Sequence, residues 1–165
     1  MKTILVIRHA KSSWANMGEA DMDRSLNERG KKDAPEMAEK LRSKNIAIDA
    51  FISSPAKRAK KTCEAFCNVY KEAKIKIIYI DKLYHASQPG FYEVIENIDS
   101  TYNNVAIFSH NPGITDFVNT LCEGVKIDNM PTCAVFSVEA DIKNWKDFGT
   151  GKKKFLFFDY PKAAN

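Results

Sequence analysis

Apolar residues along the chain fall into short continuous runs separated by longer stretches with helical spacing. Four such runs lie at residues 3–7, 50–52, 75–80 and 105–108. A continuous apolar run is typical of a strand that is covered on both faces. Two later runs, at residues 133–138 and 155–158, predict two terminal strands, for which an antiparallel orientation is one option.

Helical spacing predicts a helix after each of the four apolar runs. The first begins at a plausible cap, Asn27, and extends to about Lys44, with Pro35 either kinking it or lying near its true start. The others are expected from Ala56 to Tyr70, from about Pro89 through Ile98, and from about Gly113 through Leu121.

Strand and helix therefore alternate four times, which favours a parallel sheet between two helical layers. The expected fold class is α/β, a three-layer sandwich with a mostly parallel central sheet and helices on both faces. With 165 residues, 44% of them apolar and 28% charged, we expect one domain spanning residues 1–165.

The net charge of +4 and pI of about 8.8 favour anionic ligands without specifying one. The best support for nucleic-acid binding is the run Lys152-Lys153-Lys154, but three lysines before an apolar strand more often form a solvated turn. We therefore expect no nucleic-acid partner.

Other partners and locations are also disfavoured by the sequence. No run of about eighteen apolar residues suggests a membrane span, and the first residues lack the features of a signal peptide. We expect a cytoplasmic protein with no membrane partner. The four cysteines, Cys63, Cys67, Cys122 and Cys133, lack paired zinc-site spacing, so we expect reduced, mostly buried thiols and no metal site.

Two histidines directly follow predicted parallel strands. His9 follows the run at 3–7 and His110 follows the run at 105–108, and the third histidine in the chain is His85. Ligands of such sheets bind beyond the carboxyl ends of the strands. A lone histidine is more often structural than catalytic, but two histidines at strand ends favour a catalytic role.

Arg8 and Arg58 are candidate phosphate ligands, because a guanidinium offers a planar fork of donors matched to phosphate oxygens. Arg58 alone, among Lys57, Lys60 and Lys61, would more often be a solvated helix residue. The preceding Ser53-Ser54-Pro55 favours a binding role, since a helix start directs free N–H groups toward an anion.

These segments, in this order, resemble the signature of the histidine phosphatase (phosphoglycerate mutase-like) superfamily. The short length and the run from Arg8 to Trp14 look most like the SixA-type phosphohistidine phosphatases. The matching segments are Arg8-His9-Ala10, Leu26-Asn27-Glu28-Arg29-Gly30, Ser53-Ser54-Pro55 with Arg58-Ala59 and Thr62, and Ser109-His110.

The resemblance implies a mechanism that the residue chemistry supports. Neutral His9 attacks phosphorus in line, giving a covalent phosphohistidine that water hydrolyses. Arg8, Arg58 and protonated His110 would bind the phosphate and offset its charge during transfer, so we expect no metal ion and no cofactor.

The sequence departs from the superfamily pattern at two positions. Ala10 replaces the glycine that more commonly follows the nucleophile, and His85 stands where many relatives carry a glutamate that protonates the leaving group. His85 could act as the proton donor or be structural, and Asp81 is a weaker candidate donor. Weak acid catalysis favours phosphoramidates, whose leaving imidazole can already be protonated.

The leading hypothesis is a phosphohistidine phosphatase acting on a signalling or phosphotransfer protein. Residues 11–24 are the one obvious active-site flap, so we expect an open cleft that suits a protein substrate. One alternative is a broad phosphomonoesterase for small metabolites or for phosphoserine and phosphothreonine proteins. Another is a non-catalytic phosphate-binding module, which would have no use for a free nucleophile at His9.

Overall fold

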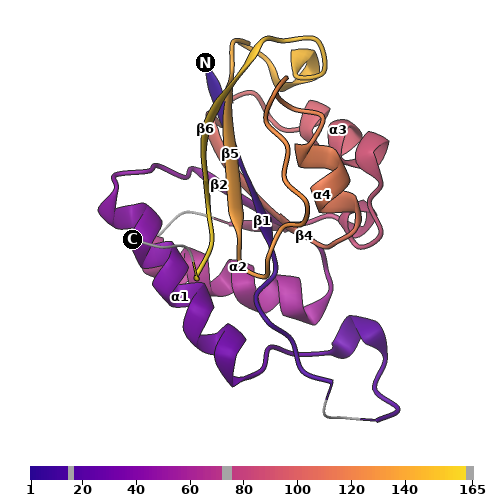
Figure 1. The fold of residues 1–165 in the computed structure, drawn as a ribbon. Coiled ribbons are helices and arrows are strands. Elements are labelled where there is room, and N and C mark those ends of the chain that lie inside the picture. The colour runs from indigo at the N-terminus through magenta and orange to yellow at the C-terminus, as the bar shows by residue number, and fades with distance from the viewer. Residues whose placement is uncertain (15–16, 72–75, 163–165) are drawn as a thin grey trace.

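The computed structural model describes residues 1–14, 17–71 and 76–162, and its centre is one six-stranded sheet. The strands follow the order β3-β2-β4-β1-β5-β6 across the sheet (Figure 1). Their bounds are Lys2–Arg8 for β1, Ala50–Ser53 for β2, Ile77–Tyr79 for β3, Asn104–Ser109 for β4, Val135–Ala140 for β5 and Lys153–Asp159 for β6.

The four strands that were expected to be parallel are parallel. β1 pairs with β4, β4 with β2, and β2 with β3, all in the same direction. β5 then pairs antiparallel with both β1 and β6, with a bulge between Ser137 and Val138. The antiparallel option for the terminal strands is therefore the one that the chain adopts.

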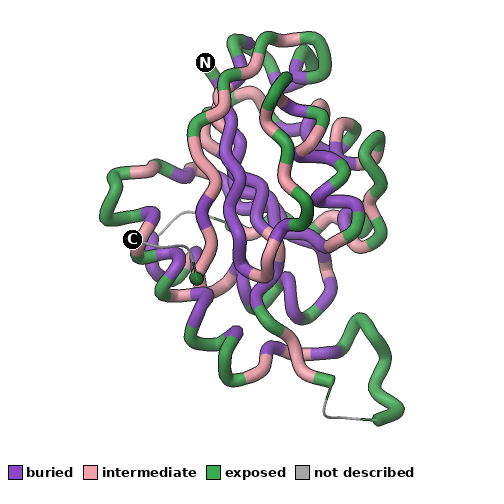
Figure 2. Tube along the Cα trace, in the orientation of Figure 1, coloured by how far each residue is buried: buried purple, intermediate pink, exposed green. Residues whose placement is uncertain are grey.

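Helices cover both faces of the sheet, as Figure 1 shows. Ile4 and Val6 point to the layer of α3 and α4, whereas Leu5 and Ile7 point to the layer of α1 and α2. Both faces of β1 are thus buried, which explains its continuous apolar run and the buried strands in Figure 2. The predicted α/β sandwich is confirmed. The helices span Glu28–Ser43 for α1, Lys57–Tyr70 for α2, Gln88–Glu96 for α3 and Gly113–Val118 for α4.

The start of α1 depends on a capping residue, Asn27, and on a glycine, Gly30. Asn27 caps the helix by accepting a hydrogen bond from the N–H of Gly30 at 2.9 Å. A side chain at Gly30 would place its Cβ 2.1 Å from the backbone oxygen of Lys11. Glycine therefore lets α1 approach the segment that follows β1 and its histidine.

Several predicted boundaries differ from the structure. Pro35 lies in the interior of α1, so the expectation that it would lie near the helix start is wrong. The last two helices end earlier than expected, α3 at Glu96 and α4 at Val118. The lysine run does not form a turn, because Lys153 and Lys154 already belong to β6. Ile75, the predicted start of the third strand, lies outside the described residues.

Within residues 1–14, 17–71 and 76–162, no helix is long and apolar enough to span a membrane. The thiols are free, with Cys63 and Cys133 buried and the other two half-buried. Burial raises the pKa of each thiol, most strongly at these two buried positions, so the side chains remain protonated.

Candidate active site

The two strand-end histidines meet beyond the carboxyl ends of β1 and β4. These strands are neighbours in the sheet, and the N–H of His9 donates to the backbone oxygen of Ser109 at 3.1 Å. The rings of His9 and His110 are 5.1 Å apart between centroids, and both residues are buried. The structure therefore brings together two histidines that lie far apart along the chain.

His9 is held in the tautomer that a nucleophile needs. Its Nδ1 lies 2.7 Å from the backbone oxygen of Ala10, and because a carbonyl only accepts, Nδ1–H must donate. Burial is the main cause that lowers the pKa of His9 to about 3, and the charges of Arg8, Arg58 and Arg24 lower it further. The ring is therefore neutral at ordinary pH, with the lone pair on Nε2.

His110 is neutral for the same reason. Burial, then the neighbouring His9 and Arg58, lowers its pKa to about 2. Its Nε2 lies 2.7 Å from the hydroxyl oxygen of Ser54, which also accepts from the N–H of Ala56 at 3.2 Å. Ser54 can thus donate to Nε2 and leave the proton on Nδ1. His110, if protonated, was expected to add positive charge to the site, but burial leaves a neutral ring that offers one N–H donor.

In both Arg8 and Arg58, terminal nitrogens donate hydrogen bonds to the protein whereas Nε does not. Nη1 of Arg8 donates to the backbone oxygen of Met130 at 2.8 Å. Both terminal nitrogens of Arg58 donate to Asp21, Nη1 to its backbone oxygen at 2.7 Å and Nη2 to its carboxylate at 3.0 Å. In each arginine the buried Nε has no partner.

Among the described residues, three buried side-chain nitrogens have no hydrogen-bond partner, and all three belong to the predicted site: Arg8 Nε, Arg58 Nε and His110 Nδ1. An unpaired buried donor is costly, so its persistence indicates a ligand that pairs with it. Arg8 and Arg58 are also close enough for their charges to lower the pKa of Arg8, beyond the larger effect of burial. Three donors, two of them cationic, fit an oxyanion.

Sequence reasoning missed three residues that complete this site. Asp21 holds Arg58, Tyr84 donates its hydroxyl proton to the Asp21 carboxylate at 2.5 Å, and Arg24 donates to the same carboxylate at 3.1 Å. Asp21 and Arg24 lie in the predicted flap, at residues 11–24, which contains another aspartate, Asp23. Only the position of Asp21 in the predicted flap could have drawn attention to it, and that signal does not separate it from Asp23.

His85 lies at the rim of the site and not inside it. It is exposed, its ring lies 4.0 Å from that of Tyr84, and Tyr84 in turn lies edge-on to His110 at 5.7 Å. His85, Tyr84 and His110 line a cavity of about 270 Å³ that extends to Asp116. The weaker candidate donor, Asp81, does not line this cavity.

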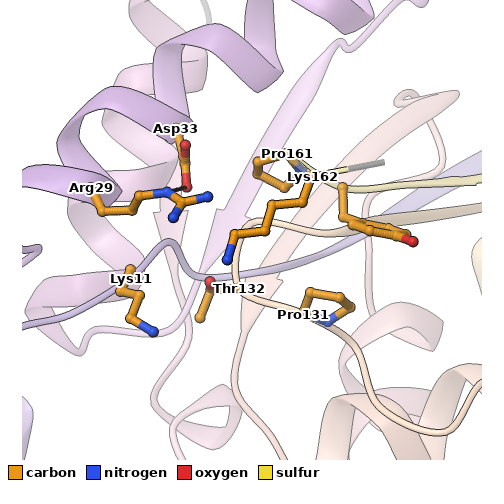
Figure 3. A pocket seen from close by; sticks show the side chains of 8 residues that line it. Lys11, Arg29, Asp33, Pro131, Thr132, Pro161 and Lys162 are labelled. Carbon is orange, nitrogen blue, oxygen red and sulfur yellow. Dashed lines mark hydrogen bonds and ion pairs between the residues drawn. The ribbon is translucent and has the colours of Figure 1, made fainter. Parts of the chain in front are cut away.

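A second cavity, of about 160 Å³, lies between the start of α1 and the chain that follows β6 (Figure 3). Arg29 projects into it and is already paired with Asp33 at 3.3 Å. Its other charged side chains, Lys11 and Lys162, belong to exposed residues. None of the candidate catalytic residues lines it, so the chemistry is not expected there.

Metal ligands do not gather near the histidines. Across the part of the chain that the structure describes, no group of three or more histidine, cysteine, aspartate or glutamate side chains could hold a metal ion. The donors left free in the site are N–H groups of arginine and histidine, which suit an anion and not a cation.

Comparisons with known proteins place this geometry in a family. The model of the histidine phosphatase superfamily (branch 1) matches residues 4–85, which include Arg8, His9 and Arg58. An uncharacterised chloroplastic protein of Arabidopsis thaliana is 27% identical over 88% of this chain and 70% of its own length. An uncharacterised protein of Mycobacterium tuberculosis is 32% identical, but the match spans 64% of this chain and 63% of that protein.

Solved structures share the whole fold. A protein of Agrobacterium tumefaciens assigned as a phosphohistidine phosphatase, SixA, matches with a TM-score of 0.80 and 24% identity over 97% of this chain and 98% of its own. The protein histidine phosphatase SixA in complex with tungstate matches with a TM-score of 0.81 and 20% identity, over 96% and 97% of the two chains. The chain therefore belongs to the histidine phosphatase superfamily and has the fold of SixA.

Proposed function

We propose that this protein is a phosphohistidine phosphatase in which Nε2 of His9 attacks the phosphoryl group. The observation that carries the proposal is the set of three buried, unpaired donors, Arg8 Nε, Arg58 Nε and His110 Nδ1, beside a histidine whose Nε2 is unprotonated. A nucleophile with free oxyanion donors around it is the arrangement that phosphoryl transfer needs.

The reaction proceeds in two displacements. Nε2 of His9 forms a bond to phosphorus while the bond from phosphorus to the substrate nitrogen breaks, and the substrate imidazole leaves with a proton on its other nitrogen. The carbonyl of Ala10 keeps accepting from Nδ1–H and so stabilises the cationic ring as it forms. Water then attacks phosphorus, the bond to Nε2 breaks, and inorganic phosphate leaves with His9 restored.

Arg8, Arg58 and His110 bind the three oxygens that carry charge through both displacements. The two guanidinium groups supply positive charge at any working pH, and His110 supplies a neutral N–H. Burial of Arg58 and His110, together with the partial burial of Arg8, strengthens these interactions, because water screens them less. Two fixed cations supply the charge that a divalent ion supplies in other phosphoryl-transfer sites, so the proposed reaction is metal-independent.

The substrate class is inferred from the leaving group. A phosphate ester releases an alkoxide that needs a proton, whereas a phosphohistidine releases an imidazole that can carry one already. In this site the candidate proton donor is His85, which is exposed at the rim of the cavity beside His110. This weak provision for acid catalysis supports a phosphoramidate, and the fold of SixA supports a phosphorylated protein as the carrier.

A broad phosphomonoesterase is the second candidate. The observation that favours it is the same cavity, about 270 Å³ in volume, where His85 could protonate the leaving oxygen of a small ester. A phosphate-binding module without turnover is less well supported, because burial keeps His9 neutral and its Nε2 available.

The test compares hydrolysis of a phosphohistidine-bearing protein with that of p-nitrophenyl phosphate, using the wild type and His9→Ala. We expect preference for phosphohistidine, loss of turnover in His9→Ala and an acid-labile labelled intermediate in the wild type. Turnover of the aryl phosphate alone would favour the phosphomonoesterase. Excess chelator should leave activity unchanged, and a loss reversed by a divalent ion would refute the metal-independent mechanism.

A further inference from the structure

Asp21 binds one end of the Arg58 guanidinium and leaves the other end open. Its backbone oxygen and its carboxylate accept from Nη1 and Nη2, at 2.7 and 3.0 Å. Nε stays buried without a partner. A guanidinium has five N–H donors around a plane, so it can bind an acceptor at its terminal nitrogens and a second one along its Nε edge.

Asp21 is itself held from two other directions. Nε of Arg24 donates to Oδ1 at 3.1 Å, and the phenol of Tyr84 donates to Oδ2 at 2.5 Å. Arg24 is fixed in turn by the hydroxyl of Ser12 at 2.9 Å and by stacking on the Trp14 ring at 3.6 Å. Arg24, Tyr84 and Arg58 thus hold this carboxylate, although its side chain is 46% exposed. An aspartate that only faces solvent needs no such partners.

This carboxylate is also held in its ionised form. The hydrogen bond from Tyr84, and then those from Arg58, hold the pKa of Asp21 well below its usual range despite the opposing effect of burial. Asp21 is therefore ionised under any working condition. A fixed anion at the terminal nitrogens keeps the long Arg58 side chain in one orientation. Without that anion, ordering the side chain would cost rotamer entropy each time a ligand binds.

We propose that Asp21 is a positioning residue, which aims the Nε edge of Arg58 at the phosphoryl group in transfer. The inference rests on the proposed role of Arg58 as a phosphate ligand. Asp21 does not touch the substrate and acts through Arg58. The same contacts would allow Asp21 to compete with the phosphoryl group for Arg58. In that case the phosphoryl group would bind the terminal nitrogens in place of Asp21, and the buried Nε would still have no partner.

The experiment replaces Asp21 with Ala and, as the conservative variant, with Glu. The matched control is Asp23→Ala, since Asp23 is an exposed aspartate in the same turn, Asp21–Asp23. Turnover of p-nitrophenyl phosphate gives kcat and KM. Equilibrium binding is measured for orthovanadate, which imitates the five-coordinate transition state, and for inorganic phosphate, which imitates the ground state.

We expect Asp21→Ala to lower kcat by ~10- to 100-fold, which is less than the ~10²- to 10³-fold loss when a charge-stabilising donor is itself removed, because Arg58 remains. KM should stay the same or fall, because removing a nearby negative charge favours an anionic ligand and offsets the weaker hold on Arg58. Orthovanadate affinity should fall with kcat while phosphate affinity changes by less than ~3-fold. Asp21→Glu should recover part of kcat, and Asp23→Ala should match the wild type.

A kcat at or above the wild-type value in Asp21→Ala would overturn the inference in favour of competition. Equal losses of orthovanadate and phosphate affinity would also overturn it, since they indicate general damage to the site. Where Asp21→Ala melts well below the wild type, Asp21→Asn replaces it, because the amide keeps the size of the side chain. Failure of the wild type on phosphohistidine would refute the proposed substrate only, because neither binding probe is turned over.

Discussion

The hydroxyl of Thr62 joins the two halves of the site, accepting from the N–H of Ala10 at 2.9 Å and donating to the backbone oxygen of Arg58 at 2.8 Å. Ala10 follows the proposed nucleophile, His9, and Thr62 lies in α2, so this buried hydroxyl couples the loop that carries His9 to the helix that carries Arg58.

Thr62→Val keeps the shape of the side chain and removes both hydrogen bonds. The N–H of Ala10 is then buried without an acceptor, which should lower the free energy of unfolding by about 1–3 kcal/mol and also lower kcat. Chemical denaturation and turnover measure the two effects. Thr62→Ser retains the hydroxyl and should lose less of both, and equal losses in Ser and Val would contradict this role.

Replacement of either arginine by lysine should be severe although the charge is kept. Lysine has no Nε edge and no planar fork, so Arg8→Lys and Arg58→Lys should each lower kcat/KM by ~10²- to 10³-fold. Arg29→Lys is the matched control, because Arg29 belongs to the cavity of Figure 3 and pairs with Asp33. Its activity should equal that of the wild type. Near-normal activity in either site variant would exclude that arginine as a phosphate ligand.

Two of the three histidines should not titrate near neutral pH. Burial lowers the pKa of His9 to about 3 and that of His110 to about 2, against about 6.5 in an unfolded chain. Nitrogen chemical shifts of the imidazoles, followed by NMR from pH 5 to 8, should therefore stay constant for both. A midpoint near 6.5 for His9 would show that its ring is not held neutral.

The same shifts predict the pH dependence of stability. Between about pH 3 and pH 6.5 the unfolded chain binds protons on these two rings that the folded chain does not, so the free energy of unfolding should rise with pH over this window. Denaturant titrations of the wild type and His110→Gln measure the effect. The variant should show the shallower slope, and equal slopes would indicate that His110 titrates normally in the folded protein.

The loss of turnover on replacing His85 should increase with the basicity of the leaving group, because a more basic leaving group depends more on a proton donor. His85→Gln should lower turnover of phenyl phosphate by ~10-fold or more and leave that of p-nitrophenyl phosphate, whose leaving group is the weaker base, nearly unchanged. Ser87→Ala, at an exposed position in the same cavity, serves as the control. Equal rates of wild type and His85→Gln on both esters would remove His85 as the proton donor.

Gly113 is expected to be indispensable for packing at the start of α4. A Cβ there would lie 1.8 Å from the backbone oxygen of Ala86, next to His85, and backbone cannot yield cheaply. Gly113→Ala should lower the free energy of unfolding by ~1–3 kcal/mol. Gly90→Ala is the contrast, because its Cβ, inside α3, would meet only ordinary contacts, the nearest at 3.6 Å. It should leave stability unchanged or raise it by up to ~1 kcal/mol.

The strand-end chemistry could be predicted from the sequence because local pattern encodes it. A continuous apolar run followed at once by Arg8 and His9 identifies both a doubly covered strand and the residues at its carboxyl end. His110 follows β4 in the same way. Parallel strands bring such ends to one edge of the sheet, and the neighbouring positions of β1 and β4 then place the two histidines together.

Only the tertiary structure decided which groups hold the arginines in place. Asp21 and Arg58 are 37 positions apart, and Tyr84 reaches the same carboxylate from a third segment. Residues 11–24 have no periodic pattern, so nothing local distinguishes Asp21, which binds Arg58, from Asp23 in the same turn. Such a choice depends on how the flap packs against α2, and packing is a property of the whole chain. The burial of His9 also depends on the tertiary structure, because its pKa falls only when strands and helices from distant segments exclude water from the ring.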